Sequence, residues 1–350
     1  MTEPGGHMRA ARLMPGARGV QVVDVPIPEP SGTSVRIRVA AAGVCRSDVH
    51  SVDGHFDHLL RLPVTLGHEV SGVVDALGPE AAGPAPGTPV VVMVGWGCGT
   101  CRWCREGRHQ ICPEGDEAGA TVDGGFADYM LVPHPQYLVP LGSIDPLTAT
   151  PFGCAALTAF AAVTRVLPNL REGSSLAVVG TGGLGTYAVH YASRLSSASI
   201  VAVDERASAI ERALDAGAHE GLVADTATHE AVLAALGRAR FDAVLDFVGN
   251  DQSLALAAQI VARRGTVALL GLADGQLPFG FGTLPPEASL TTVVAGTIRD
   301  LHDVVRLAQV RVLHVPQVAF PLEEADRAIA LLRAGQIDGR AVLVPSGGAA

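Results

Sequence analysis

The segment Leu176-Ala177-Val178-Val179-Gly180-Thr181-Gly182-Gly183-Leu184-Gly185 places an apolar run directly before the pattern G-x-G-x-x-G. The residues after it have helical spacing, and the buried face of that helix is expected to use Leu184, Ala188, Ala192 and Leu195. An ordinary glycine-rich turn is the alternative, but a strand before the glycines and a helix after them let a pyrophosphate reach the helix N-terminus. The segment predicts a dinucleotide site at Gly180, Gly182, Gly183, Leu184 and Gly185.

An acidic residue ends the next predicted strand. Asp204 closes the apolar run Ile200–Asp204 and lies 24 residues after Gly180, where a carboxylate in this kind of fold hydrogen-bonds the ribose 2′-hydroxyl. A 2′-phosphate would meet that carboxylate, so the sequence favours NAD over NADP. Arg206, two residues later, would weaken the preference.

The two parts of the chain differ in pattern. Residues 1 to about 150 consist of short β-rich runs separated by glycine and proline, which is typical of a barrel or sandwich. From residue 153 onward apolar runs alternate with helical stretches, which predicts a doubly wound parallel sheet. The expected strands of that sheet are Leu176–Gly180, Ile200–Asp204, Gly221–Ala224, Ala243–Val248 and Thr266–Leu272.

The alternating pattern breaks near Gly296, and a last β segment at residues 339–344 could return to the first domain. We therefore expect an α/β protein whose nucleotide-binding domain spans residues 153–297. A β-rich domain is expected to combine residues 1–152 and 298–350.

Four cysteines form the pattern C-x2-C-x2-C-x7-C at Cys98, Cys101, Cys104 and Cys112. Four thiolates complete the tetrahedral coordination of Zn²⁺ and leave no position for a substrate. A redox dithiol and four unrelated buried thiols are the alternatives, and the zinc-ligand spacing disfavours both. The pattern predicts a structural zinc whose binding is coupled to local folding.

The two other cysteines lie in apolar stretches. Cys45 and Cys154, with His68, offer two sulfurs and one nitrogen, a set that leaves a fourth zinc position open. Either cysteine alone is more often a core residue than a ligand. The nucleotide motif changes that balance, because hydride chemistry needs a group that stabilises an alkoxide.

The chain contains no lysine, and all 25 of its basic residues are arginines. Arginine stays protonated and cannot form a Schiff base. This excludes pyridoxal-phosphate enzymes, lysine aldolases, Walker-A ATPases and Tyr/Lys short-chain dehydrogenases. A carbonyl substrate must be activated by a metal, an arginine or backbone dipoles.

Composition also restricts the partners. The formal net charge is −10, and no arginine run forms a basic stripe, so nucleic-acid binding is not expected. No stretch approaches about 18 consecutive apolar residues, and the first residues lack the features of a signal peptide, so membrane association is not expected either. Cysteines grouped for metal fit a reducing cytoplasm. The expected partner is a small molecule.

Several motifs together resemble one known family. They are residues 45–50 (Cys-Arg-Ser-Asp-Val-His), Gly67-His68-Glu69, the four-cysteine loop, residues 124–129 (Gly-Gly-Phe-Ala-Asp-Tyr) and the nucleotide motif. Over nearly the whole chain the sequence resembles the zinc-dependent alcohol dehydrogenases of the medium-chain dehydrogenase/reductase family, above all bacterial secondary-alcohol dehydrogenases. The resemblance implies a GroES-like catalytic domain interrupted by a Rossmann domain. It also implies two zinc ions per chain, NAD, and a homodimer or homotetramer joined through the Rossmann sheet.

The same resemblance assigns a catalytic zinc to Cys45, His68 and Cys154. Glu69 matches a family residue that lies just outside the metal ligands or exchanges with one of them. Asp48 would orient the His68 ring, as outer groups do for metal-bound histidines.

Three further residues receive roles by resemblance. Arg46 matches a position that contacts the cofactor pyrophosphate. Ser47 and His50 match the family's proton relay.

His55 and His58, in the next loop, would touch substrate or a stray metal, or more simply belong to a solvated loop.

Three positions depart from the family. Related bacterial enzymes often carry aspartate where this chain has Cys154. The usual Gly-Thr-Arg reads Gly296-Thr297-Ile298, which moves the arginine to Arg299. Ala295 replaces an aromatic residue and would enlarge the substrate pocket.

The sequence therefore predicts an NAD-dependent zinc alcohol dehydrogenase acting on primary or secondary alcohols, or on the matching aldehydes and ketones. A biosynthetic zinc reductase acting on an enal or a polyketide-like carbonyl is the alternative among enzymes. A non-catalytic nucleotide-binding zinc scaffold is the alternative of another class, but a scaffold needs no open metal position.

Overall fold

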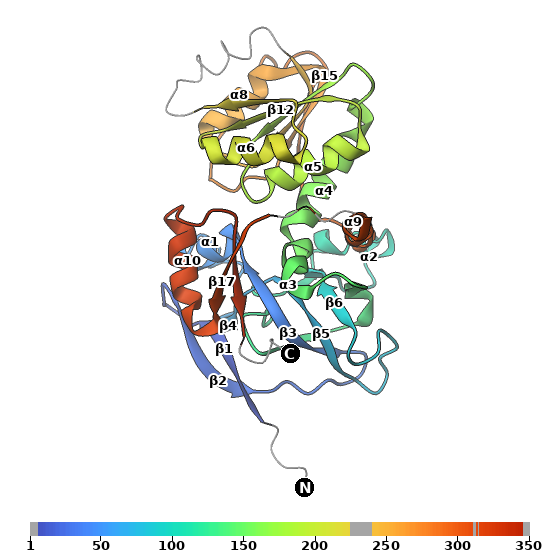
Figure 1. Ribbon diagram of the computed structural model, residues 1–350, viewed down its shortest axis with the longest axis vertical. Helices are drawn as coiled ribbons and strands as arrows, with labels where there is room; N and C mark the ends of the chain where they lie inside the picture. The colour runs from blue at the N-terminus through green and yellow to red at the C-terminus, as the bar shows by residue number, and fades with distance from the viewer. Residues whose placement is uncertain (1–5, 225–239, 311–312, 314, 346–350) are drawn as a thin grey trace. The chain divides into compact units, whose positions relative to one another are not determined.

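The computed structural model describes residues 6–224, 240–310, 313 and 315–345. The chain divides into two compact units, one of Met1–Leu157 with Thr297–Ala350 and one of Thr158–Gly296 (Figure 1). We call them unit 1 and unit 2. The domain limits expected from the sequence stay a prediction, since compactness alone does not define a functional domain.

Six parallel strands build the sheet of unit 2, in the order β13-β12-β11-β14-β15-β16. This is the strand order of dinucleotide-binding folds, whose ligand binds where the order reverses, here between β11 and β14. The predicted doubly wound parallel sheet is confirmed, and β16 is a strand that the sequence did not predict. The strands are β11 (Ser175–Val179), β12 (Ser199–Asp204), β13 (Glu220–Val223), β14 (Phe241–Asp246), β15 (Val261–Leu269) and β16 (Ser289–Thr292).

Helices cover both faces of this sheet. Ala177 and Val179 of β11 belong to a core cluster with Leu256 of α8, whereas Val178 lies against Gly185 at the start of α5. Because successive side chains of a strand point to opposite faces, α5 and α8 lie on opposite sides. The described helices of unit 2 and of the segment leading into it are α4 (Ala155–Val166), η4 (Leu167–Asn169), α5 (Gly185–Leu195), α6 (Ala207–Ala216) and α8 (Asp251–Ile260).

The predicted buried face of α5 is right at Ala188 and Ala192, which are fully buried. It is wrong at Leu195, which is 36% exposed. Leu195 is the last residue of the helix, so no further turn covers it.

A long bent strand, β3 (Val35–Val44), organises unit 1. It pairs with β5 along most of its length, and two irregularities of register bend it. Residues Val35–Arg38 pair with β9 and residues Ala42–Val44 with β18. Since β5 occupies one edge, β9 and β18 share the other edge of β3.

The sheet around β3 has seven strands, in the order β10-β6-β5-β3-β18-β17 with β9 beside β3. Two smaller sheets, β2-β1-β4 and β7-β8, complete the strands described for unit 1. Their bounds are β1 (His7–Leu13), β2 (Val20–Pro26), β4 (Val64–Thr65), β5 (Glu69–Leu77), β6 (Pro89–Val92), β7 (Gly95–Trp96), β8 (Asp116–Glu117), β9 (Tyr129–Val132), β10 (Leu138–Pro140), β17 (Gln317–Pro321) and β18 (Arg340–Val344).

The C-terminal segment packs on the N-terminal one. Strand β18 joins β3, and α10 packs against α1, so both ends of the chain build unit 1 (Figure 1). The helices described there are α1 (Arg46–Asp53), α2 (Arg102–Arg105), η1 (His109–Ile111), η2 (Pro135–Tyr137), α3 (Pro146–Ala149), η3 (Thr150–Gly153), α9 (Ile298–Val310), η5 (Leu322–Glu324) and α10 (Ala325–Arg333).

Within the described ranges, no single helix has the length and apolar character needed to cross a membrane. One bent pair, Pro146–Gly153 with Ala155–Asn169, passes on length and composition alone. Its side chains include the buried core residues Ala149, Phe152 and Leu157.

Candidate active site

Four metal-binding side chains meet in unit 1. One ligand atom from each of Cys45, His68, Glu69 and Cys154 lies within 4.8 Å of all the others. Cys45 follows β3 and caps α1, while Glu69 opens β5 and pairs with Gly43 of β3. A Cβ atom on Gly43 would lie 2.4 Å from Glu69 Oε2. The glycine therefore provides the space in which the carboxylate turns toward the cysteines.

The side chain of Asp48 fixes both Cys45 and His68. Its Oδ2 accepts the backbone N–H of Cys45 at 2.8 Å, and its Oδ1 lies 3.6 Å from Nδ1 of His68. A carboxylate on the Nδ1 side leaves Nε2 as the nitrogen for a metal. The Ser47 hydroxyl lies 3.3 Å from that Nε2. Three predicted residues thus surround one imidazole.

Charge in the cluster is balanced among its own members. Burial lowers the pKa of His68, but the carboxylate of Asp48 outweighs burial and raises it well above the ordinary value. The hydrogen bond from Cys154, opposed by burial, lowers the pKa of Cys45 well below its ordinary value. The same bond, together with burial, raises the pKa of Cys154. The bond between the two sulfurs therefore favours the thiolate on Cys45, and a zinc ion held by both sulfurs would also displace the proton from Cys154.

A buried arginine completes the cluster. Arg340 of β18, 6% exposed, binds Oε2 of Glu69. The other carboxylate oxygen, Oε1, is buried and has no hydrogen-bond partner among the described residues. Burial raises the pKa of Glu69 to about 7, although the charge of Arg340 lowers it. An unpartnered oxygen beside two sulfurs and a nitrogen matches the donor set of a zinc site.

The sequence prediction missed Arg340. The sequence feature that could have pointed to it is an arginine at the start of the apolar run Arg-Ala-Val-Leu-Val, residues 340–344. An arginine is almost never fully buried unless it is paired. That run therefore predicted a buried acidic partner without saying which one.

The prediction also missed Glu117. This residue of β8 pairs with Gly95 of β7, and the turn after it is held by bonds from Ala120, Thr121 and Val122 to its carbonyl oxygen. The residue as a whole is exposed, but its carboxyl group is surrounded by protein atoms, and this burial raises the pKa of the carboxyl. The charges of His68, Cys45 and Asp48 act on it as well. Glu117 thus adds a carboxyl group within electrostatic range of the ligand cluster.

The other predicted residues of α1 lie at the surface of unit 1. Arg46 is exposed in the first turn of the helix, and His50 is half-buried one turn later. Nδ1 of His50 lies 2.9 Å from Nδ1 of His55. The solvated-loop interpretation of His55 is therefore incomplete, because this exposed residue also contacts a predicted relay residue.

The predicted nucleotide residues form a cluster of their own in unit 2. Gly180 has a φ of +82°, and a Cβ on Gly185 would lie 2.0 Å from the Gly180 carbonyl oxygen. Gly182 is different, since its missing Cβ would meet only the guanidinium of Arg206, at 3.2 Å. Two glycines are needed for the tight turn, and the third leaves backbone open to a phosphate. Leu184 and Gly183 complete the turn into α5.

Asp204 stands at the end of β12 beside this turn. Its Oδ2 accepts the N–H of Thr181 at 2.8 Å, and its Oδ1 accepts the backbone N–H and Nε of Arg206 at 3.0 and 3.3 Å. A carboxylate offers about four lone-pair directions, so a ribose hydroxyl can still be accepted. Arg206 lies between this carboxylate and Gly182.

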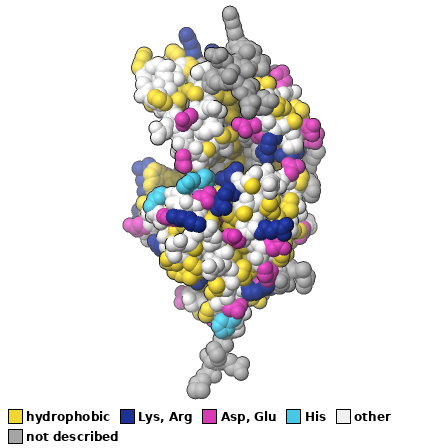
Figure 2. All heavy atoms as spheres, turned by 90° about the vertical axis from the view of Figure 1, so that its left-hand side faces the viewer, with side chains coloured by type: hydrophobic (Ala, Val, Ile, Leu, Met, Phe, Trp, Pro, Cys, Tyr) yellow, Lys and Arg dark blue, Asp and Glu magenta, His cyan; other side chains and the backbone are white. Residues whose placement is uncertain are grey.

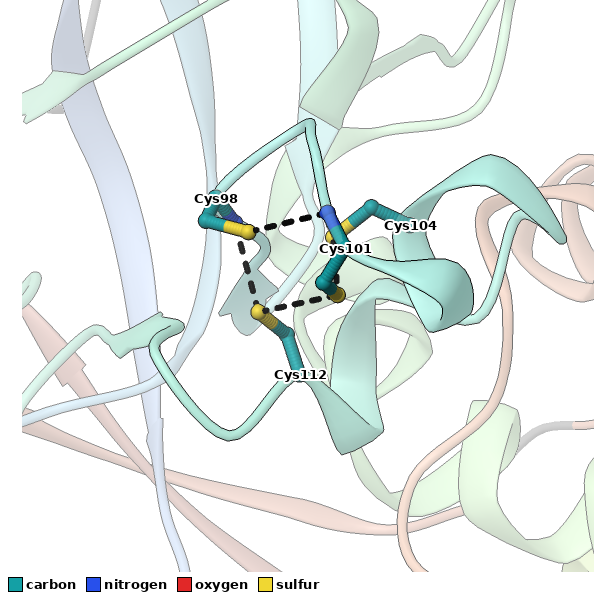
Figure 3. Close-up of side chains that lie close together, drawn as sticks. All are labelled: Cys98, Cys101, Cys104 and Cys112. Carbon is teal, nitrogen blue, oxygen red and sulfur yellow. Dashed lines mark hydrogen bonds between the residues drawn. The ribbon is translucent and has the colours of Figure 1, made fainter.

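The four clustered cysteines surround one point in space (Figure 3). The Sγ atom of Cys101 lies 3.5 Å from that of Cys104 and 3.7 Å from that of Cys112. A tetrahedron with Zn–S bonds of about 2.3 Å has sulfur–sulfur edges of about 3.8 Å. Backbone N–H groups of Cys98 and Cys101 point at sulfur atoms of the set, as expected for thiolates. These residues fit a closed zinc site.

Comparison with known proteins gives concordant matches. Residues 31–143 match the family model "Alcohol dehydrogenase GroES-like domain", and residues 183–309 match "Zinc-binding dehydrogenase". The NAD-dependent alcohol dehydrogenase of Sulfurisphaera tokodaii is 34% identical, over 97% of this chain and all of that protein. The D-arabinose 1-dehydrogenase (NADP⁺) of Saccharolobus solfataricus is 32% identical, over 96% of this chain and 97% of that protein.

A solved structure agrees in fold. The alcohol dehydrogenase of Aeropyrum pernix superposes with a TM-score of 0.88 at 30% identity, over 96% of this chain and all of that one. The predicted combination of a GroES-like domain with a Rossmann domain is confirmed by these matches. The chain belongs to the zinc-dependent alcohol dehydrogenases of the medium-chain dehydrogenase/reductase family.

Proposed function

We propose that this protein is an NAD-dependent zinc alcohol dehydrogenase that moves a hydride between the nicotinamide C4 and the carbinol carbon of a primary or secondary alcohol. The observation that carries the proposal is the open donor set, in which one ligand atom from each of Cys45, His68 and Cys154 lies within 4.8 Å of the others. A closed scaffold site has no use for such a set. The protein is an oxidoreductase whose cofactors are zinc and NAD.

Zinc, when bound, supplies the positive charge that lowers the pKa of a substrate hydroxyl, as it lowers the pKa of water from about 15.7 to about 7. Cys45, His68 and Cys154 hold it, and Glu69 is the candidate for an additional or exchanging ligand. Asp48 keeps the His68 ring in the tautomer that presents Nε2. The structural zinc belongs to Cys98, Cys101, Cys104 and Cys112.

The remaining residues of α1 act on the proton and the cofactor. Ser47 accepts the proton that the substrate hydroxyl loses while it gives up its own hydroxyl proton, and His50 receives the proton that the serine releases. Arg46 is a cofactor pyrophosphate ligand, together with the glycine turn at residues 180–185. Asp204 binds the adenosine ribose, and Arg206 flanks it. We do not include Arg299 among the cofactor-binding residues, because Ile298 occupies the position where the family usually has an arginine.

The experiment is the formation or consumption of NADH with a panel of alcohols, aldehydes and ketones. Wild-type protein with both zinc sites loaded is compared with Cys154→Ala, which lacks one sulfur ligand of the open site. Turnover by wild type and none by Cys154→Ala supports the proposal. A zinc-loaded protein that binds NADH but turns over no member of the panel contradicts it.

A polyhydroxylated carbonyl, such as an aldose, is a second candidate substrate. It is favoured by Glu117, whose carboxyl group lies within electrostatic range of the ligand cluster and can accept hydrogen bonds from hydroxyl groups next to the reacting carbon. The similar protein from Saccharolobus solfataricus is a D-arabinose 1-dehydrogenase. Comparing D-arabinose with cyclohexanol in wild type and Glu117→Leu tests this. Loss of the sugar activity alone supports it, and an equal effect on both substrates opposes it.

We further propose a homodimer or homotetramer joined through the sheet of unit 2. The support is β16, an edge strand with three exposed residues out of four. Unit 2 also exposes the apolar side chains of Phe279, Phe281 and Val294. An uncovered strand edge of this kind can pair with another strand. Light scattering on wild type and Leu290→Arg tests it, and a wild-type monomer at micromolar concentration contradicts it.

The proposed location is the cytoplasm. All six cysteines are free of disulfide bonds, and their roles as metal ligands require reduced thiols. Cell fractionation with an antibody to the protein is the test.

A further inference from the structure

The end of helix α1 brings two histidine rings together. Gly54 follows the helix with a φ of +87°, and its N–H donates to the carbonyl oxygens of His50 and Ser51. The N–H of His55 also donates to the His50 carbonyl, at 3.0 Å. The left-handed glycine therefore reverses the chain and returns His55 to the residue one turn before it.

The two rings touch through like atoms. Nδ1 of His50 lies 2.9 Å from Nδ1 of His55, with ring centroids 5.2 Å apart. Phe56 packs against His50 with ring centroids 5.4 Å apart and restricts its rotation. Two unprotonated nitrogens would repel at this distance, so one Nδ1 carries a proton that the other accepts.

Exposure increases along the pair. His50 is half-buried, whereas His55 is exposed, and Figure 2 shows histidine side chains gathered at the surface over α1. A proton that reaches His50 therefore has an outward neighbour in direct contact. Apart from the glycine between the two histidines, no sequence feature predicted this contact.

We infer that His55 is the outer carrier of a two-histidine proton wire, and this inference rests on the proposed dehydrogenase function. During alcohol oxidation Nε2 of His50 accepts the proton, and the proton on its Nδ1 passes to Nδ1 of His55. Nε2 of His55 then releases its proton to water, so one proton enters and one leaves. Exchange of ring protons with water restores the starting tautomers, and carbonyl reduction runs the transfers in reverse.

The charged groups around the pair are themselves paired. Asp57 forms a salt bridge with Arg18, whose guanidinium lies against Gly54. Asp53 pairs with Arg333 of α10, the helix that packs on α1. Each of these two carboxylates near the pair therefore has an arginine as its counter-charge.

The test compares His55→Asn, His55→Phe, His50→Gln and the double variant His50→Gln/His55→Asn in the zinc-loaded protein. His58→Asn, in the same exposed loop, is the matched control. Alcohol oxidation with saturating NAD is measured from pH 6 to about pH 9, together with KM for NAD. General-base help is worth about 100-fold in full and less when water substitutes. We expect both His55 variants to slow oxidation about three- to tenfold below about pH 7, with little loss at the alkaline end.

Two further results are expected if the histidines act in series. The double variant is no slower than His50→Gln alone, because the loss of His50 already interrupts the proton transfer in which His55 takes part. Added imidazole restores part of the rate of His55→Asn without changing KM for NAD. Ring-nitrogen NMR of wild type should also show one Nδ1–H shared between two histidines, a signal that His55→Asn removes.

Contrary results are equally distinct. A wild-type rate in His55→Asn with a slow His55→Phe would mean that His55 only positions His50, and it would overturn the inference. Losses that multiply in the double variant would do the same. Absence of turnover in wild type, with the shared Nδ1–H signal present, would instead count against the proposed function.

Discussion

The carboxylate of Glu69 and the guanidinium of Arg340 form a buried ion pair between residues 271 positions apart in the sequence. Glu69 is fully buried and Arg340 nearly so. The pair joins the first residue of β5 to the first residue of β18, on either side of β3. The last strand of the chain thus supplies the counter-charge for the metal cluster.

Removing one partner of this ion pair should lower the free energy of unfolding of the protein. Arg340→Met leaves the Glu69 carboxylate buried without its partner, which typically costs about 3–5 kcal/mol. Chemical denaturation measures the loss. The double variant Glu69→Gln/Arg340→Met should recover part of it, because no charge is then left alone, and an additive double variant would show that the pair does not act as a unit.

The stability of zinc-free protein should depend on pH through Glu69. Burial raises the pKa of this carboxyl from 4.5 to about 7, so the folded chain holds the proton more tightly than the unfolded chain. This contribution to stability is fully present below the unfolded pKa and is lost as the pH rises through about 7. Glu69→Gln should lack that part of the profile. Parallel profiles of the two apoproteins, from urea denaturation between pH 4 and 8, would contradict the assignment.

Asp48→Asn should weaken zinc binding at the open site. The amide keeps the size of the side chain but removes the charge that lies 3.6 Å from Nδ1 of His68. Loss of such an outer partner typically costs about 10- to 100-fold in metal affinity. Competition with a chromogenic chelator measures it. Asp24→Asn on β2 is the control, and equal affinities in wild type and Asp48→Asn would remove Asp48 from the site.

Mutations should distinguish the roles of the two metal sites. Cys101→Ser should lose one zinc and lower the melting temperature, because closed zinc sites stabilise folding. Cys154→Ala should lose the other zinc and abolish turnover. Metal analysis, thermal unfolding and activity are measured on both. Equal catalytic damage in a still-folded Cys101→Ser protein would contradict the division.

Asp204 should set a preference for NAD. A 2′-phosphate beside this carboxylate loses a hydrogen bond and is repelled, so NADP should bind at least about tenfold more weakly, or about 1.4 kcal/mol. The measurement is kcat/KM for both cofactors in wild type and Asp204→Ala. The guanidinium of Arg206 would lie 3.2 Å from a Cβ atom built on Gly182. If the wild-type enzyme prefers NADP, Arg206 rather than Asp204 is the dominant contact with the cofactor.

Much of the fold was predictable because its signals are local. The strands and glycines of unit 2 follow one another as a βαβ unit must, so the order of apolar runs determined the parallel sheet. The extra strand β16 was not predicted, since Ser289–Thr292 is polar and mostly exposed. Its place at the sheet edge removes the need for apolar side chains.

The sequence by itself determined the donor types: six cysteines and one histidine in zinc-ligand patterns, and a glycine turn after an apolar strand. Only the tertiary structure decided that Arg340 neutralises Glu69, that Glu117 lies within electrostatic range of the same cluster, and that His55 contacts His50. Spacing along the chain reports on neighbours within a few residues. A charge that is buried away from water needs an opposite charge beside it. Strand pairing decides which residue supplies that charge, and here the pairing of β18 with β3 brings Arg340 to Glu69.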